Sequence, residues 1–195
     1  MNKLYLYHPK SKLFLINAIK SIVSEHKNDT IINLNSIDVS AIEDMSYLFD
    51  SFRLYNFDVS EWNVSSVKYM NYMFHGCIKF NSDISKWNVS NVIRMNGMFY
   101  NCYKFNSDIS NWNTSKVWDM SEMFSGCENF NSDLSKWDVS RVKYMYEMFK
   151  DCKIFNSDIS NWNILRVEDM QEMFEGCEQF NQDLSKWGVD NISDI

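Results

Sequence analysis

Apolar residues recur along this chain with a step of 25 residues. The tryptophans of this pattern are Trp62, Trp87, Trp112, Trp137, Trp162 and Trp187. Methionine, phenylalanine and cysteine follow the same step, as in Met70 and Met95, Phe74 and Phe99, and Cys77 and Cys102. The register holds without insertion or deletion from about residue 30 onward, with a degenerate first copy. A fixed period of this length predicts a stack of about six repeats that bury a continuous apolar interior.

One half of each repeat has helical spacing. Val92, Met95, Met98, Phe99 and Cys102 fall at positions i, i+3, i+6, i+7 and i+10, which predicts one face of a helix or of a tight 3₁₀ turn. A serine precedes each such segment and predicts a helix N-cap. These serines are Ser40, Ser65, Ser90, Ser115 and Ser140, and Ser40 with Glu43 would form a capping box.

The other half of the repeat alternates as a short strand does. In residues 80–87, Ile84 points one way and Asp83 and Ser85 point the other way. Equivalent strands stacked at about 4.8 Å would form a parallel sheet. The predicted fold class is therefore an α/β repeat solenoid, with a parallel β-sheet on one side and short helices or 3₁₀ turns on the other. Asn81 and its counterparts are predicted to form a hydrogen-bonding ladder along the stack.

The two ends of the chain differ from the repeat. Residues 1–29 are predicted to form an N-terminal cap, with a strand at 4–7 and an amphipathic helix at 9–25. The apolar residues of that helix are Leu13, Ile16, Ile19, Ile22 and Val23. Residues 30–195 then form the solenoid within the same structural domain. Trp187, Val189, Ile192 and Ile195 begin a further, incomplete coil. Because solenoid ends need covering, this uncapped coil could pair with a partner or with a second copy of the chain.

The repeat has the form V-x-x-M-x-x-M-F-x-x-C-x-x-F-N-x-D-I-S-x-W. It resembles the BspA-like leucine-rich-repeat surface proteins, in their branch with 25-residue units. The resemblance covers about 160 residues, and its motif is specific because five copies match at almost every anchor position. The resemblance implies a leucine-rich-repeat-like solenoid and a role in protein–protein interaction, often adhesion, with no catalytic residues.

Composition narrows the function further. The chain has 19 basic and 26 acidic residues, a net charge of -7, which argues against nucleic-acid binding through phosphates. The sequence contains no run of about 18 apolar residues, so membrane insertion is not expected. No signal peptide is evident, so a cytoplasmic location is expected for the chain as given, or a surface or secreted one by another export route.

The cysteine column invites a metal or redox interpretation. A spacing of 25 is not that of a metal site, and side chains in register point the same way, which suits a disulfide poorly. Buried thiols on the apolar face are the prediction. No catalytic motif is found among the serines, histidines and glycines, so neither an enzyme nor a cofactor is expected.

A column of aspartates leaves two interpretations open. It includes Asp83, Asp108, Asp133 and Asp158, and it begins at Asp58. Like charges about 5 Å apart repel by about 1 to 3 kcal/mol per pair, so something must offset the column. Lysines three residues later, such as Lys86 and Lys136, and backbone N–H groups are candidates. The alternative is an edge that attracts a basic partner or Ca²⁺.

Specificity must come from positions that do not repeat. On the side with helical spacing these include aromatic residues, a type common among interface anchors. The predicted partner-binding residues of this kind are Tyr69, Tyr72, Tyr100, Tyr103, Trp118, Tyr144 and Tyr146, with His75 beside them. The last coil is acidic instead, with Glu168, Asp169, Glu172, Glu175 and Glu178. This change from aromatic to acidic residues along one face marks a candidate binding surface. The alternative is that these side chains are solvated and bind no partner.

Three functions follow from these observations. The first is a non-catalytic module that binds an unknown protein through its variable surface. The second is a structural or self-assembling solenoid, for which the uncapped last coil argues. The third is an acidic decoy that resembles a polyanion.

Overall fold

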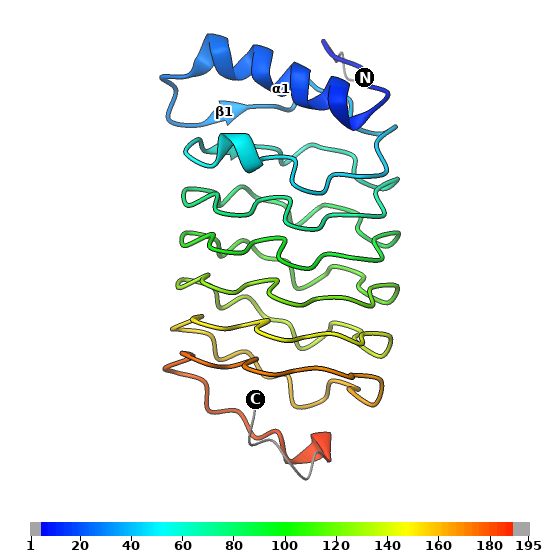
Figure 1. The fold of residues 1–195 in the computed structure, drawn as a ribbon, viewed down its shortest axis with the longest axis vertical. Helices are drawn as coiled ribbons and strands as arrows, with labels where there is room; N and C mark the ends of the chain where they lie inside the picture. The colour runs from blue at the N-terminus through cyan, green and yellow to red at the C-terminus, as the bar shows by residue number, and fades with distance from the viewer. Residues whose placement is uncertain (1–4, 189–195) are drawn as a thin grey trace.

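The 25-residue repeats form successive coils that lie one on the next along a single axis (Figure 1). The computed structural model describes residues 5–188. Counted from the tryptophan column, the coils are 37–61, 62–86, 87–111, 112–136, 137–161 and 162–186. Single parallel β-bridges join each coil to the next in the same register. They connect Asp44, Tyr69, Arg94, Asp119, Tyr144 and Asp169 in turn.

Regular secondary structure is confined to the two ends. The elements within the described residues are α1 (Lys12–His26), β1 (Ile32–Asn33), the 3₁₀ helix η1 (Asp50–Phe52), β2 (Phe57–Asp58) and the 3₁₀ helix η2 (Ser185–Trp187). The strands β1 and β2 are parallel, and Ile32 pairs with Phe57 one repeat later. The coils between β2 and η2 consist of turns and isolated bridges.

Tight turns occupy the half of the repeat that has helical spacing. Met98 N–H donates to the Met95 carbonyl at 3.2 Å, and Cys102 N–H donates to the Phe99 carbonyl at 2.9 Å. Within the first of these turns, Gly97 has a φ of 58° and donates its N–H to the Ser121 carbonyl of the next coil at 2.8 Å. A left-handed residue at this point stops any helix, although the turns still place the apolar side chains on one side.

The prediction that serines cap these segments is wrong. Ser90 N–H donates to the side chain of Asn88 at 3.1 Å, and Ser40 N–H donates to Asp38 at 3.0 Å. Each serine therefore closes a short turn around the Asp or Asn two residues earlier. No helix follows Ser40, so the capping box with Glu43 does not form.

On the other half of the repeat, hydrogen bonds from backbone N–H groups to side chains take the place of most of the predicted β-sheet. Ile84 N–H donates to the Ser107 hydroxyl of the next coil at 3.3 Å, and Asn106 N–H donates to the Asn81 side chain at 2.8 Å. These bonds use the donors of a β-ladder, which is why the sheet is limited to β1 and β2. The predicted asparagine ladder is confirmed along Asn81, Asn106, Asn131, Asn156 and Asn181.

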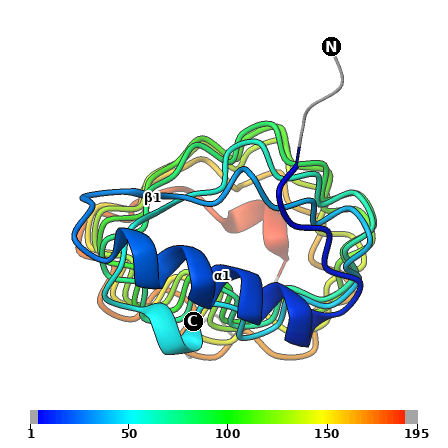
Figure 2. The ribbon, with the colours of Figure 1, turned by 90° about the horizontal axis from the view of Figure 1, so that it is seen from above.

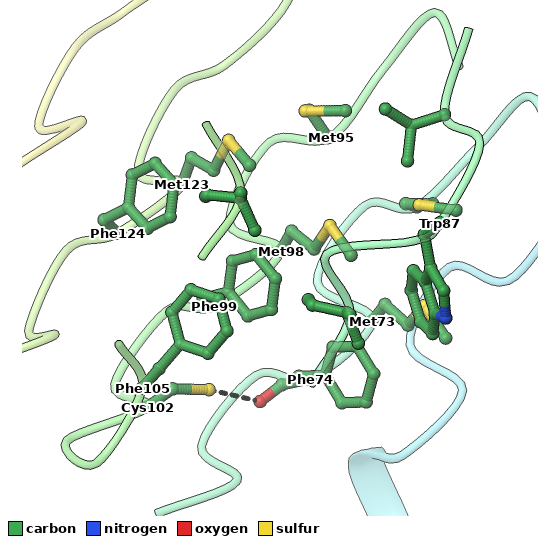
Figure 3. Packing of buried hydrophobic residues seen from close by; sticks show 14 of the residues in the cluster. Met73, Phe74, Trp87, Met95, Met98, Phe99, Cys102, Phe105, Met123 and Phe124 are labelled. Carbon is green, nitrogen blue, oxygen red and sulfur yellow. Dashed lines mark hydrogen bonds between the residues drawn. The ribbon is translucent and has the colours of Figure 1, made fainter. Parts of the chain in front are cut away.

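Aromatic rings stack through the interior of the coils. Trp87 and Trp112 lie 6.5 Å apart between ring centroids and are nearly parallel. Phe74 and Phe99, both labelled in Figure 3, lie 5.7 Å apart. Each tryptophan of the 25-residue column also donates its indole N–H to a backbone carbonyl 28 residues earlier, as Trp112 does to the Ile84 carbonyl at 3.2 Å. The prediction that these columns form the core is confirmed for the coils from 62 to 161.

The helix α1 lies across one end of the stack (Figure 2). Its buried residues are Leu15, Ala18, Ile19, Ile22 and Val23. Leu13, predicted to face the coils, is instead 66% exposed. It lies about 200° around the helix from Leu15, on the outer side. Within the described residues, α1 included, no helix has the length and apolar character needed to cross a membrane.

The predicted strand at the N-terminus is described only in part. Its residue Tyr7 forms a parallel bridge with Ile37, while Leu4 lies outside the described residues. At the other end Trp187 is buried, and Val189, Ile192 and Ile195 lie outside the described residues. In coil 162–186 Trp162, Ile164 and Met173 are buried, and the other apolar residues that pack on the core are only half-buried. The half-buried residues are Val167, Met170, Phe174, Cys177, Phe180 and Leu184.

Candidate functional site

The cysteine column packs inside the stack. Cys102 is fully buried, and its thiol donates to the Phe74 carbonyl of the preceding coil with a sulfur–oxygen distance of 2.9 Å (Figure 3). Burial raises the pKa of the Cys77 thiol to about 12 and that of Cys177 to about 12. The prediction of buried cysteines is confirmed, with Cys177 only half-buried. A thiol with such a pKa is a poor nucleophile and a poor metal ligand at neutral pH.

The aspartate column is satisfied by local hydrogen bonds. Asp108 accepts from Ser110 N–H at 3.0 Å, and Asp83 accepts from the backbone and the hydroxyl of Ser85 at 3.0 and 2.6 Å. These bonds lower the pKa of both carboxyl groups, and repulsion from neighbouring aspartates is a smaller, opposing effect. Lys86 contributes to the lowered pKa of Asp83, as the sequence predicts.

The other carboxylates of the aspartate column accept the same kind of hydrogen bond. Asp133 and Asp158 accept from Ser135 and Ser160 at 2.9 and 3.0 Å. Across residues 5–188 no three His, Cys, Asp or Glu side chains are grouped so that they could hold a metal ion. The Ca²⁺ interpretation therefore receives no geometric support from these residues.

Four rings on consecutive coils form an exposed aromatic cluster, which we define as Tyr47, Tyr72, His75 and Tyr100. Tyr47 stacks on Tyr72 at 5.1 Å, and His75 makes edge contacts with Tyr72 at 5.8 Å and with Tyr100 at 5.3 Å. Tyr47, which is not among the residues predicted from the sequence, is 51% exposed. The cluster thus presents continuous aromatic surface across three coils.

Glu122 extends this cluster to Tyr146. The Tyr72 hydroxyl donates to one Glu122 carboxylate oxygen at 2.7 Å, and the Tyr146 hydroxyl donates to the other at 2.6 Å. Burial and the bond to Glu122 raise the pKa of Tyr72, while for Tyr146 the bond comes first and burial second. Tyr72 reaches two coils along because Gly97, between them, has no side chain. A Cβ there would lie 2.1 Å from the Tyr72 ring.

A second group of side chains surrounds Arg94. Its guanidinium carbon lies 4.8 Å from the centre of the Trp118 ring, and one of its nitrogens lies 3.0 Å from Asp119. Trp118 makes an edge contact with Tyr144 at 5.9 Å. The rings of Trp118 and Tyr144 are therefore in contact. A parallel β-bridge places the backbone of Tyr69 beside that of Arg94. These contacts hold the aromatic side chains in fixed orientations.

Other predicted site residues stand apart from the two groups. The Tyr103 ring is 42% exposed and makes no ring contact within the described residues. In the same part of the chain no ring contact, hydrogen bond or ion pair joins the aspartate column to the aromatic cluster. The acidic last coil is partly neutralised, because Lys143 lies 2.6 Å from Glu168 and Lys150 pairs with Glu172 and Glu175.

Comparison with known proteins gives one family. The family model described as "Mycoplasma protein of unknown function, DUF285" matches residues 17–123 and again residues 104–195. No curated protein and no solved structure matches the chain. The two matched ranges together cover α1 in large part and all the coils.

Proposed function

The chain belongs to the DUF285 family, a BspA-like repeat family, and from this premise we propose that it is a non-catalytic module that binds another protein. The fold that we propose for the stacked coils is a solenoid of the leucine-rich-repeat type. Its finer role would be adhesion, in which the coils serve as a rigid support for side chains that differ from one coil to the next.

One observation carries this proposal. The side chains of the invariant columns are used in packing and hydrogen bonding. The aromatic cluster of Tyr47, Tyr72, His75 and Tyr100 instead occupies positions whose residue type changes along the stack, and it is partly open to solvent. Rings that are already held by one another lose little entropy on binding, which favours their use as anchors.

The surroundings of the cluster favour a basic partner. His75 lies 3.6 Å from Asp50 and 3.1 Å from Arg53, and Arg53 already pairs with Asp50. Glu122 accepts from two tyrosine hydroxyls and has no cationic partner within the described residues, so it is the carboxylate that remains available to a basic partner. Aromatic faces next to carboxylates suit arginine and lysine side chains, through cation–π contacts and charge. We therefore propose a basic segment of a partner protein as the target of this surface.

Comparative capture tests the proposal. Wild-type protein, a Tyr47→Ala/Tyr100→Ala variant and a Tyr103→Ala variant would be immobilised and exposed to an extract of the native host. We expect at least one protein to be retained by the wild type and by Tyr103→Ala, and to be lost with the double variant. Tyr103 is the matched control because it is an exposed tyrosine outside the cluster. Equal retention by all three proteins would contradict a role for the cluster.

Self-association is the second candidate. The observation that favours it is the half-buried apolar set of coil 162–186, which includes Met170, Phe174 and Phe180. Light scattering over a wide concentration range distinguishes the two, since a strictly monomeric chain would rule out assembly through this coil. A polyanion decoy has less support, because Lys143 and Lys150 pair with the glutamates on which it would depend.

A further inference from the structure

A hollow of about 550 Å³ lies where the cap meets the first coils. Its lining comes from the end of α1, from coil 37–61 and from the two coils that follow. The lining residues are Lys27, Asn28, Asp29, Thr30, Leu54, Tyr55, Asn56, Lys79 and Lys104. Lys79 and Lys104 occupy equivalent positions in adjacent coils, and Lys27 is the C-cap of α1. We call this hollow the lysine groove.

Its three ammonium groups lack acidic partners. Within residues 5–188 no ion pair or hydrogen bond holds the side chain of Lys27, Lys79 or Lys104. Elsewhere in this acidic chain lysines do find carboxylates, as Lys68 does with Glu43 at 2.8 Å. The one carboxylate of the groove, Asp29, lies 2.9 Å from His26. The groove therefore concentrates positive charge in a chain whose net charge is -7.

The asparagine ladder does not extend to Asn56, and among the described residues this leaves an unpaired amide donor in the lysine groove. The asparagine ladder runs from Asn81 to Asn181, and each side-chain oxygen accepts an N–H from the next coil. Asn56 stands one step before it, yet its side chain has no hydrogen bond within the described residues. Its amide is thus available in the groove, where Asn28 and Thr30 add further polar groups.

An apolar wall completes the groove. Leu54 is 71% exposed, and Tyr55 is half-buried with its ring 6.2 Å from Phe57. In the later coils the position of Leu54 is taken by Lys79 and Lys104, then by Asn129 and Ile154. The combination of three cations, amide donors and apolar surface thus arises once along the described stack, next to the cap.

We propose that the lysine groove binds a phosphate-bearing ligand with two or more negative charges. Lysine ammonium groups bind phosphate oxygens as point charges, and hydrogen bonds between charged groups are the stronger ones. Several cations in one hollow favour a multivalent anion over a single carboxylate. A long nucleic acid fits poorly, because it needs cations spread along a surface. The same chemistry occurs in a soluble polyphosphate and in a phospholipid headgroup, and experiment separates these sources.

Calorimetric titration with inorganic tripolyphosphate tests the groove. We expect saturable binding to the wild-type chain, and binding weakened about tenfold or more in Lys79→Gln/Lys104→Gln. The matched control is Lys86→Gln/Lys136→Gln, which removes the same charge on the aspartate side and should stay within about twofold of the wild type. A Lys79→Arg/Lys104→Arg variant keeps the charge and should retain binding, which separates loss of charge from loss of structure.

Vesicles identify the source of the phosphate. Co-sedimentation with phosphatidylglycerol but not phosphatidylcholine vesicles, lost in Lys79→Gln/Lys104→Gln alone, would assign a lipid headgroup. Tripolyphosphate binding without co-sedimentation would assign a soluble ligand. The proposal is overturned if wild-type protein binds neither probe, or if the groove variant and its control lose binding equally.

Discussion

Aspartate and asparagine are interchangeable in the turns of this stack. Asn113 and Asp138 occupy the same position in adjacent coils, and their side chains accept from Ser115 and Ser140 at 3.1 and 3.0 Å. The neutral amide and the carboxylate thus make the same bond to a backbone N–H two residues later. The acidity of Asp108, in the aspartate column, is therefore not needed for its turn.

This equivalence predicts a difference between two substitutions at Asp108. Asp108→Asn should leave the midpoint of urea unfolding at pH 7 close to that of the wild type, because the amide oxygen can still accept from Ser110. Asp108→Ala should lower the midpoint, because the acceptor is lost. Urea unfolding followed by tryptophan fluorescence measures both, and equal midpoints for the two variants would contradict the local role of the side chain.

The same bonds make stability depend on pH. The pKa values of Asp108 and Asp133 lie below their usual range because the charged forms accept hydrogen bonds from Ser110 and Ser135. A folded-state pKa below the unfolded one stabilises the fold above about pH 4, and this contribution is lost as the pH falls through the folded-state value. Between pH 5 and pH 2, Asp108→Asn/Asp133→Asn should therefore lose less stability than the wild type. An identical pH dependence would exclude these carboxylates as its source.

At the scale of the element, each coil is held to the next by alternate residues. The N–H groups of Met95, Gly97, Phe99 and Asn101 all donate to the following coil, at 3.2, 2.8, 3.0 and 2.7 Å. Gly97 and Asn101 have positive φ, as do Tyr72 and Glu122, which are the counterparts of Gly97 in the two adjacent coils. A left-handed residue other than glycine costs about 1 to 2 kcal/mol, and these bonds between coils offset that cost.

The left-handed residues also explain what could not be predicted from the sequence. The period and residue types were enough to predict the buried columns, the asparagine ladder and a helix near residues 9–25. Tight turns mimic helical spacing, however, and Tyr72 and Glu122 carry no residue-type signal for a positive φ. Likewise Tyr72 and Tyr146 were predicted separately. Their link through Glu122 depends on the space that Gly97 leaves, which only the folded coils reveal.

Gly97→Ala tests the coupling between this turn and the aromatic cluster. An alanine Cβ would need the left-handed φ of 58° and would meet the Tyr72 ring at 2.1 Å. We expect a loss of about 2 to 4 kcal/mol in the free energy of unfolding, from backbone strain and overpacking together. In a Tyr72→Ala background only the strain should remain, about 1 to 2 kcal/mol. Equal costs in the two backgrounds, from urea unfolding, would show that Tyr72 does not fill this space.

At the scale of the whole molecule, most contacts of a coil are with its neighbours, although the Tyr72–Glu122 bond reaches two coils along, so stability is distributed largely along one dimension. The α1 helix covers one end, and the central coils bury their phenylalanine, methionine and cysteine columns completely. In coil 162–186 most of the corresponding residues, including Phe174 and Phe180, are only half-buried, whereas Met173 remains buried. Less apolar surface removed from water means that less free energy holds this coil in place.

Matched phenylalanine deletions should expose this gradient. Phe124 is fully buried and stacks on Phe99, Phe130 and Phe149, with centroids 5.7, 4.0 and 5.7 Å away. Phe124→Ala should cost about 3 to 5 kcal/mol, because a cavity opens between two neighbouring coils.

Phe174→Ala, at the equivalent position of coil 162–186, should cost distinctly less, because its ring is half-buried. Hydrogen exchange of the wild type measures the same gradient without a substitution. Amides of coil 162–186 should exchange before those of coil 112–136, since local opening at the less buried coil exposes less apolar surface to water. Equal costs of the two deletions, together with uniform exchange along the coils, would mean that the stack unfolds as one cooperative unit and that burial in the last coil does not set its stability.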